Sequence, residues 1–252
     1  MSRVKNTQKN NGETMDVGEI SSNALKYSLS NFKKVLILGI LTITSFLIIP
    51  GFLVLGYLFK ILKESLNGFD NLPEFNEWSK MFIDGLKVFF VILVYSIIPA
   101  ALIGVGMRNS ILPLINTQGT GPLIQSTLSF GILSGLTIIG ILLGILVSFV
   151  IAVALANMAC QNKLDAAFRF GEIFKRIGKI GWVDYIIWYI VMILVAIIVY
   201  SISSTLILIF IGIILVPLII TPYFAMFYAR SAALIYTSTE SEVWQRHPHI
   251  KH

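Results

Sequence analysis

The chain has 252 residues, of which 56% are hydrophobic and only 13% are charged. A soluble domain carries about twice that share of charged residues, so the composition excludes a soluble globular protein. The net charge of +6 does not indicate nucleic acid, because the basic residues flank long apolar runs, where Lys and Arg mark the cytoplasmic side of a membrane. We therefore expect a multi-pass protein of the cell membrane whose immediate partners are membrane lipids, with no nucleic-acid partner.

The apolar runs are continuous rather than alternating, which favours helices over the strands of a barrel. Several runs are longer than about 18 residues, the length that predicts a membrane span. We expect an all-α membrane protein with four spanning helices, a Pro-broken re-entrant helical pair and amphipathic surface helices. The predicted spans cover residues 88–106, 130–156, 182–200 and 205–229, and the serine-rich segment 201–204 is the expected turn between the last two.

Polar segments at both ends set the limits of the membrane domain. Residues 1–18 are rich in Asn, Lys, Thr and Gly, a composition that predicts a disordered N-terminal tail. Residues 237–252 form a polar C-terminal tail. Between them, residues 19–236 are expected to make a single polytopic membrane domain.

Three segments beside the predicted spans, residues 19–34, 73–87 and 163–180, have amphipathic periodicity. A Lys or Arg near an anionic leaflet gains about 1 kcal/mol, so we expect these segments to form a cytoplasmic collar at headgroup level. The alternative is that they only anchor the helix bundle. The candidate membrane-surface residues are Lys26, Lys33, Lys34, Arg169, Lys175, Arg176 and Lys179.

The first apolar run, Val35 to Phe59, is interrupted by Pro50 and Gly51. A proline in mid-helix removes a backbone hydrogen bond and clashes with the preceding turn. The run is therefore either a kinked spanning helix or two half-helices that enter and leave on one side of the membrane.

The distribution of Lys and Arg distinguishes these two topologies. If the first run crosses once, the 19 basic residues divide into 12 on one side and 7 on the other. If it re-enters, Arg108 alone lies opposite the remaining 18. The positive-inside rule favours the strongly asymmetric arrangement. We therefore predict a re-entrant pair broken at Pro50 and Gly51, with both termini in the cytoplasm.

The run from Phe130 to Ala156 contains no charged residue and repeats a small side chain at every fourth position. In lipid, helices gain little hydrophobic energy by meeting, so close backbone approach over small residues supplies much of the attraction. This pattern predicts a central helix with one packing face. The face consists of Gly140, Gly144, Ser148, Ala152 and Ala156.

Catalytic patterns are weak throughout the sequence. No ionisable residue falls near the centre of a predicted span, which argues against an ion-coupled pump, and no glycine-rich phosphate loop or nucleophile elbow occurs. One acidic cluster, Glu74, Glu77 and Asp84 beside Trp78, could bind a cation or transfer protons, but a solvated helix face explains it more simply. We expect no catalytic site, no cofactor and no metal.

Two motifs carry a resemblance to a known family. Leu72 to Phe75 with Trp78 reads LPEF-x-x-W, and Phe82 with Asp84 to Lys87 reads F-x-DGLK at the entrance to a span. Together with FRFGEIF…IGW between Phe168 and Trp182, these resemble the archaeal membrane proteins grouped as domain-of-unknown-function family 4013. The resemblance covers about residues 20 to 235. It implies a prokaryotic membrane protein but brings no activity or functional residues.

These observations predict a non-enzymatic integral membrane protein whose collar binds lipid, a protein partner or a second copy of the chain. The second hypothesis is a permease for a small or lipid-like molecule, because discontinuous helices line many transport sites. A polar cavity at mid-depth near the three prolines of the apolar runs, Pro50, Pro99 and Pro217, would favour transport.

Overall fold

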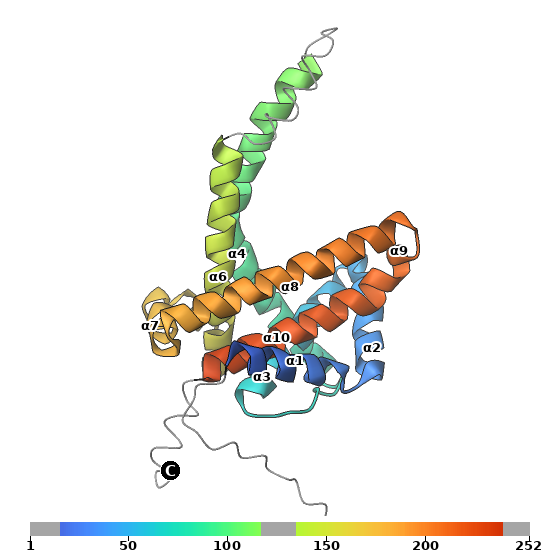
Figure 1. Cartoon of the computed structure of the whole chain (residues 1–252), viewed down its shortest axis with the longest axis vertical. Helices are drawn as coiled ribbons and strands as arrows, with labels where there is room; N and C mark the ends of the chain where they lie inside the picture. The colour runs from blue at the N-terminus through green and yellow to red at the C-terminus, as the bar shows by residue number, and fades with distance from the viewer. Residues whose placement is uncertain (1–15, 117–134, 239–252) are drawn as a thin grey trace, which may run out of the picture.

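The computed structural model describes residues 16–116 and 135–238 (Figure 1), and its described part contains helices and no strand. Residues 1–15, 117–134 and 239–252, which include most of both predicted tails and the start of the predicted central helix, lie outside it. The elements in chain order are α1 (Val17–Leu29), α2 (Phe32–Ile43), the 3-10 turn η1 (Thr44–Leu47), α3 (Ile49–Leu66), α4 (Trp78–Asn116), α6 (Gly135–Gln161), the 3-10 turn η2 (Leu164–Phe168), α7 (Phe170–Ile180), α8 (Trp182–Leu208), α9 (Gly212–Leu215), the π-helical turn η3 (Val216–Ile220) and α10 (Thr221–Thr237).

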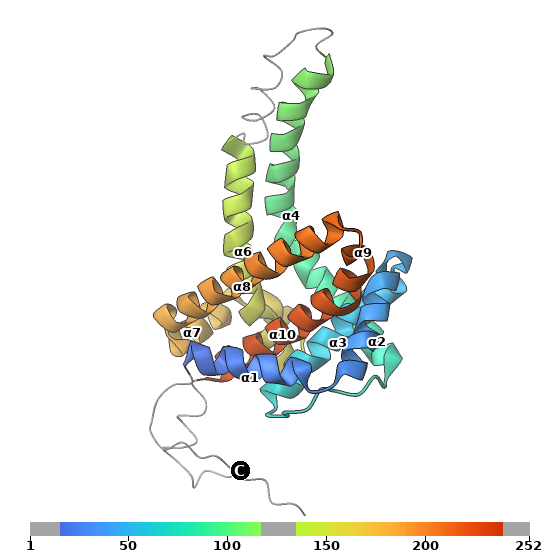
Figure 2. The ribbon, with the colours of Figure 1, turned by 45° about the vertical axis from the view of Figure 1, so that its right-hand side comes forward.

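Four helical segments of the described part are long and apolar enough to cross a membrane, as predicted. They are Trp78–Arg108 within α4, Gly135–Gln161, Trp182–Leu208 and Gly212–Thr237. A bent helix pair accompanies them, since α1 and the segment Phe32–Leu47 meet at 83°. Figures 1 and 2 show α4 and α6 rising together from the body of the molecule, with α8 and α10 running obliquely beside them.

The predicted helix over residues 73–87 begins only at Trp78 and is not a separate element. The chain is irregular before Trp78, where Glu77 has a φ of 54°, and α4 then runs without interruption to Asn116. The amphipathic segment is therefore the first part of the spanning helix, because no helix breaker separates it from the apolar residues that follow. The residues around Arg108, which follow the predicted span 88–106, are also helical as far as Asn116.

The predicted turn at residues 201–204 is wrong, because α8 continues to Leu208. The hydroxyls of Ser201 and Thr205 each donate to the carbonyl four residues earlier, at 2.8 and 2.9 Å. Bonds of this kind let hydroxyl residues stay in a helix that water does not surround. The chain instead turns just after Leu208, at Phe210, which has a φ of 62°.

The first apolar run is discontinuous, and its break lies slightly earlier than Pro50 and Gly51. Ile48 has a φ of 66° between η1 and α3. Pro50 then occupies the first turn of α3, where its missing N–H costs no hydrogen bond. The two helices on either side of the break, α2 and α3, contact each other (Figure 2).

Two glycines bring α3 and α4 into backbone contact. A methyl group built on Gly56 would lie 1.8 Å from the Met81 carbonyl oxygen, and one built on Gly85 would lie 1.8 Å from the Phe52 carbonyl oxygen. Neither position can hold a side chain unless a helix shifts. This reciprocal contact fixes the crossing of α3 over α4, and it was not recognised in the sequence.

The predicted surface helices bury much of their apolar faces against protein. In α1, Ile20, Ala24 and Tyr27 are buried, and α1 lies along α10 (Figure 2). In α7, Ile173, Ile177 and Ile180 are buried in the same core as Trp188. Packing within the bundle therefore accounts for part of the amphipathic pattern.

Candidate functional site

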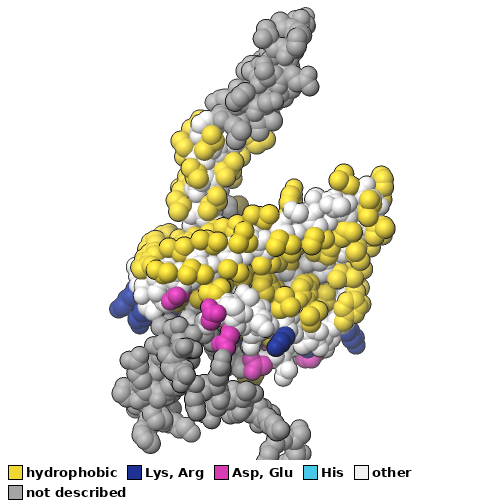
Figure 3. All heavy atoms as spheres, viewed as in Figure 1, with side chains coloured by type: hydrophobic (Ala, Val, Ile, Leu, Met, Phe, Trp, Pro, Cys, Tyr) yellow, Lys and Arg dark blue, Asp and Glu magenta, His cyan; other side chains and the backbone are white. Residues whose placement is uncertain are grey.

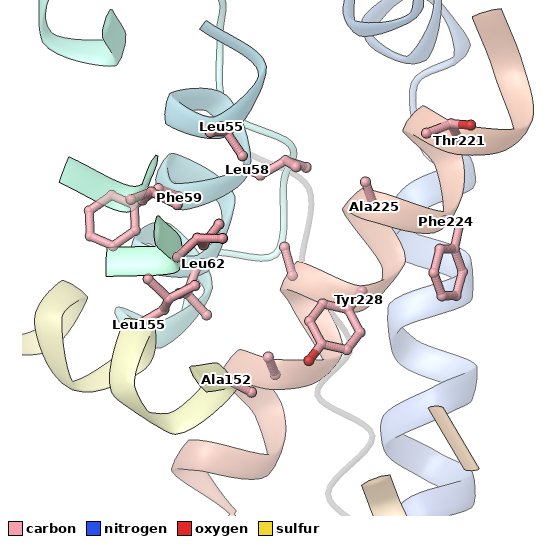
Figure 4. A pocket seen from close by; sticks show the side chains of 14 residues that line it. Leu55, Leu58, Phe59, Leu62, Ala152, Leu155, Thr221, Phe224, Ala225 and Tyr228 are labelled. Atoms are coloured by element: carbon pink, nitrogen blue, oxygen red, sulfur yellow. The ribbon is translucent and has the colours of Figure 1, made fainter. Parts of the chain in front are cut away.

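An apolar cavity of about 320 Å³ lies between α3, α4, α6 and α10 (Figure 4). This volume falls within the range of small-molecule sites, about 300–1,000 Å³. Its lining comes from four helices that are far apart in the sequence. The lining residues are Leu55, Leu58, Phe59, Leu62, Val88, Ile92, Ala152, Leu155, Thr221, Phe224, Ala225, Tyr228, Ala229 and Ala232.

Side-chain size explains why space remains at this place. On α3 the lining residues are Leu and Phe at helical spacing, and in Figure 4 Leu58 points towards α10 whereas the Phe59 ring points away from it. The facing positions on α10 include Ala225, Ala229 and Ala232, and α6 contributes Ala152. Since a methyl group fills little of the volume opposite a leucine, the bundle closes around a cavity instead of a packed core.

The lining is apolar except for two hydroxyl groups, those of Thr221 and Tyr228 (Figure 4). Among the residues that the structure describes, no charged side chain lines the cavity. The Thr221 hydroxyl points away from α3 in Figure 4, so the chemistry of this site is that of a hydrocarbon pocket with the Tyr228 hydroxyl as its neutral hydrogen-bonding group.

A second apolar hollow, a groove of about 620 Å³, lies between the C-terminal half of α8 and the start of α10. Thr221 and Phe224 line both the groove and the cavity. Tyr200 and Leu208 on the groove are strongly exposed, at 75% and 78%. The cavity and the groove are therefore neighbouring hollows on two sides of these shared residues of α10.

The small-residue face of α6 meets several neighbours. A methyl group on Gly140 would lie 2.9 Å from the Ile103 backbone nitrogen of α4, so the two backbones are in contact, whereas Gly144 lies at ordinary distance from Pro99. Ser148 is exposed and bonds Tyr189. Ala152 lines the cavity, and Ala156 is buried in the core.

Three of the seven candidate membrane-surface residues bind protein groups. The Lys34 ammonium is largely buried and donates to the Leu72 carbonyl and the Glu74 carboxylate, both at 2.6 Å. Arg169 pairs with Asp165 and Glu172. Arg176 donates to the Tyr236 carbonyl at 2.5 Å and lies over its ring.

The other four, Lys26, Lys33, Lys175 and Lys179, are exposed. Large apolar side chains beside them are exposed as well. They are Leu25 at 47%, Leu29 at 63% and Phe32 at 58% near the first two lysines, and Phe170 at 50%, Phe174 at 44% and Trp182 at 48% near the last two. Each group combines apolar contact area with positive charge.

The acidic cluster is divided into separate ion pairs. Glu74 pairs with Lys34, Glu77 with Lys80, and Asp84 with Lys87. Glu77 and Asp84 line a small cleft of about 130 Å³ together with Lys60, Lys63 and Glu64, but Glu74 and Trp78 do not. The hydrogen bond from Lys34 holds the pKa of the Glu74 carboxyl below its usual range. Within the described residues, no group of three or more His, Cys, Asp or Glu side chains is placed to hold a metal ion.

Two polar networks were missed in the sequence. Asn157, buried on α6, donates to the Ala166 carbonyl at 2.8 Å and accepts from the Tyr236 hydroxyl. Arg230 on α10 has a side chain only 3% exposed and donates to the Phe69 carbonyl and the Asp70 carboxylate. Asn157 thus connects α6 to η2 and α10, and Arg230 connects α10 to the segment between α3 and α4. The isolated positions of these two residues in the sequence did not indicate these contacts.

The fold and the cavity define a multi-pass α-helical membrane protein with an apolar site inside its helix bundle. The model of the family described as "Protein of unknown function (DUF4013)" matches residues 37–208. The chain belongs to this family, which confirms the resemblance carried by the LPEF-x-x-W and F-x-DGLK motifs. Neither a curated protein nor a solved structure matches the chain.

Proposed function

We propose that this protein is a non-enzymatic membrane protein that binds the hydrocarbon chain of a lipid in the cavity between α3, α4, α6 and α10. The observation that carries the proposal is the apolar lining, in which twelve of the fourteen residues have no polar side-chain atom. A polar solute would lose its hydration there without gaining partners, whereas a hydrocarbon chain would lose nothing.

The energy of this binding comes from packing. The surrounding bilayer is itself hydrocarbon, so transfer of a chain into the protein brings little hydrophobic gain. The atoms that line an empty cavity lack neighbours on one side and lose their dispersion contacts, about 0.1–0.2 kcal/mol for each atom pair. A chain that fills the cavity restores these contacts.

The membrane topology that we propose has both termini in the cytoplasm and α2 and α3 as a re-entrant pair. The segment Phe32–Leu47 would be about 24 Å long at about 1.5 Å per residue, too short for a hydrocarbon core of about 30 Å. Figure 3 shows the charged side chains of this face gathered around α1 and α7, while the upper part, around α8, carries apolar side chains. Arg108 lies on α4 about 30 Å from Lys87, roughly one bilayer core away.

The collar in this proposal consists of two groups of exposed residues on α1–α2 and on α7–α8. Lys26 and Lys33, with Leu25, Leu29 and Phe32, would lie at headgroup level on one side of the molecule. Lys175 and Lys179, with Phe170, Phe174 and Trp182, would lie there on the other. Anionic headgroups and acyl chains suit this combination of charge and exposed apolar area.

A permease is the second candidate, and the break at Ile48 is the observation that favours it, because broken helices line many transport sites. The prolines do not support it. Pro50, Pro99 and Pro217 are absent from the lining of the cavity, and that lining is apolar. We therefore place lipid binding first.

Lipids that copurify with the protein test this function. An Ala225→Phe variant fills the cavity, whereas Ala101→Phe adds the same side chain at an exposed position of α4 outside the lining. The wild type and the Ala101→Phe variant should retain tightly bound lipid after extensive washing in detergent, as measured by mass spectrometry, and Ala225→Phe should lose it. Equal lipid content in all three proteins would contradict the proposal.

A further inference from the structure

We propose that the cavity selects an uncharged lipid whose hydroxyl or carbonyl group forms a hydrogen bond with Tyr228. This inference rests on the proposed function, because it names the class of ligand for the same cavity. It adds a specificity-determining residue to a site otherwise defined by its apolar lining.

The hydroxyl of Tyr228 differs from those of the other tyrosines. Tyr95 donates to the Ala167 carbonyl at 2.7 Å, Tyr185 to the Phe149 carbonyl at 2.6 Å, and Tyr189 to the Ile145 carbonyl at 2.9 Å. Tyr27, Tyr57, Tyr223 and Tyr236 also donate to a protein oxygen. Tyr200 has no such bond but is 75% exposed.

Tyr228 is half-buried and lines the cavity, yet no residue in the described ranges 16–116 and 135–238 pairs with its hydroxyl. Its ring is held in place, since it packs beside the Trp188 ring with 6.0 Å between centroids. Trp188 is in turn fixed by a 2.6 Å hydrogen bond from its indole nitrogen to the Ser231 hydroxyl. The hydroxyl of Tyr228 is therefore a positioned polar group that makes no hydrogen bond to the described residues.

An unpaired hydroxyl in apolar surroundings is unfavourable, because it has given up its hydrogen bonds to water without replacing them. In the interior of a bilayer no bulk water is present to satisfy it. A ligand that brings a hydroxyl or carbonyl to Tyr228 removes this cost, and a plain hydrocarbon chain does not. A charged group is excluded, because the lining has no opposite charge to pair with it and an unpaired buried charge costs far more than a neutral dipole.

The groove between α8 and α10 points to the bilayer as the source of this ligand. Thr221 and Phe224 line both the groove and the cavity, and the groove includes the exposed residues Tyr200 and Leu208 on α8. An uncharged lipid can approach through this side of the molecule without passing the charged side chains around α1 and α7.

A pair of probes that differ in one functional group tests the inference. Full-length protein in detergent micelles is equilibrated with equal amounts of a long-chain primary alcohol and the alkane of the same length. Bound probe is measured by mass spectrometry after gel filtration, and the amount retained by Ala225→Phe is subtracted as micellar background. We expect the wild type to prefer the alcohol about fivefold, the ratio for one hydrogen bond of about 1 kcal/mol.

Tyr228→Phe removes only the hydroxyl and should bind the two probes equally. Tyr189→Phe is the matched control, because its hydroxyl already bonds the Ile145 carbonyl and it lies outside the cavity lining, so it should keep the preference. If cavity-dependent binding persists but Tyr228→Phe still prefers the alcohol, or the wild type has no preference, the role of Tyr228 is wrong while lipid binding stands. If neither probe exceeds the Ala225→Phe background, lipid binding fails and the role of Tyr228 fails with it.

Discussion

The Lys34 ammonium lies 2.6 Å from the Glu74 carboxylate and is largely buried, although the Glu74 side chain is 75% exposed. The same ammonium donates to the Leu72 carbonyl, so it fastens the start of α2 to the irregular segment before α4. In this position Lys34 holds the bundle together and is withdrawn from the lipid headgroups.

Replacement of Lys34 by Met should therefore destabilise the protein, while Lys33→Met should have little effect. The first change leaves a buried carbonyl without its donor, which costs about 1–3 kcal/mol, whereas Lys33 is exposed. Unfolding in mixed detergent micelles, followed by circular dichroism, measures the difference. Equal loss of stability in both variants would contradict this role of Lys34.

The Lys34–Glu74 pair also predicts a pH dependence. Its hydrogen bond and charge lower the pKa of Glu74 from the ordinary value of 4.5, so the folded state holds the carboxylate more strongly than the unfolded state does. The contribution is complete above about pH 4.5 and disappears as the pH falls through the lowered pKa. The stability difference between wild type and Glu74→Gln should shrink on acidification below pH 4.5, as measured by melting temperature. A difference that stays constant down to pH 3 would exclude this linkage.

Gly56→Ala and Gly85→Ala should each weaken the crossing of α3 over α4. A methyl group at either position meets a carbonyl oxygen of the other helix at 1.8 Å, and overpacking of this kind typically costs about 1–3 kcal/mol. Gly104→Ala is the control, because nothing lies within 4 Å of the added methyl group. The expected result is a lower melting temperature for the first two variants and an unchanged melting temperature for Gly104→Ala.

Ser231→Ala should destabilise the contact between α8 and α10. The buried Trp188 indole nitrogen donates to Ser231 at 2.6 Å, and removal of the acceptor leaves that donor unpaired at a cost of about 1–3 kcal/mol. Ser201→Ala, at an exposed position of α8, is the control. A quenching or spectral shift of the Trp188 fluorescence should accompany the loss of stability, and its absence would argue against the hydrogen bond.

Cysteine labelling from outside intact cells tests the topology. In a Cys160→Ala background, a cysteine at Asn71 should be protected from a membrane-impermeant reagent, and one at Gln118 should react. The reverse pattern would show that the protein has the opposite orientation, and reaction at both sites would show that α4 does not cross the membrane between them.

The all-helical class and the four spans were predictable because length and continuous hydropathy determine which segments can cross lipid. The serines of α8 and the amphipathic start of α4 were misread for a common reason. Both were taken as boundaries from polar character alone, but hydroxyls that bond their own helix and charges near a helix end do not interrupt a span.

The cavity could not have been predicted. It depends on Leu55 and Leu62 facing Ala225 and Ala229 from helices that are far apart in the sequence, and no periodicity within either helix shows which residues oppose each other. The buried state of Lys34 and Arg230 has the same origin, because their partners lie on segments that only the tertiary fold brings near. Gly140 was found because its spacing repeats, whereas Gly56 and Gly85 belong to no repeat.

The shallow packing of α8 has a consequence for how the sequence can vary. Its buried residues are Tyr185, Trp188, Met192 and Ser203, and the rest of its 27 residues turn partly or wholly outward. Exchanges among Ile, Leu and Val should therefore be almost neutral along most of this helix, because a fluid environment accepts any aliphatic shape. On α10 the buried stretch from Phe227 to Tyr236 is nearly continuous, and the same exchanges there should be selected against.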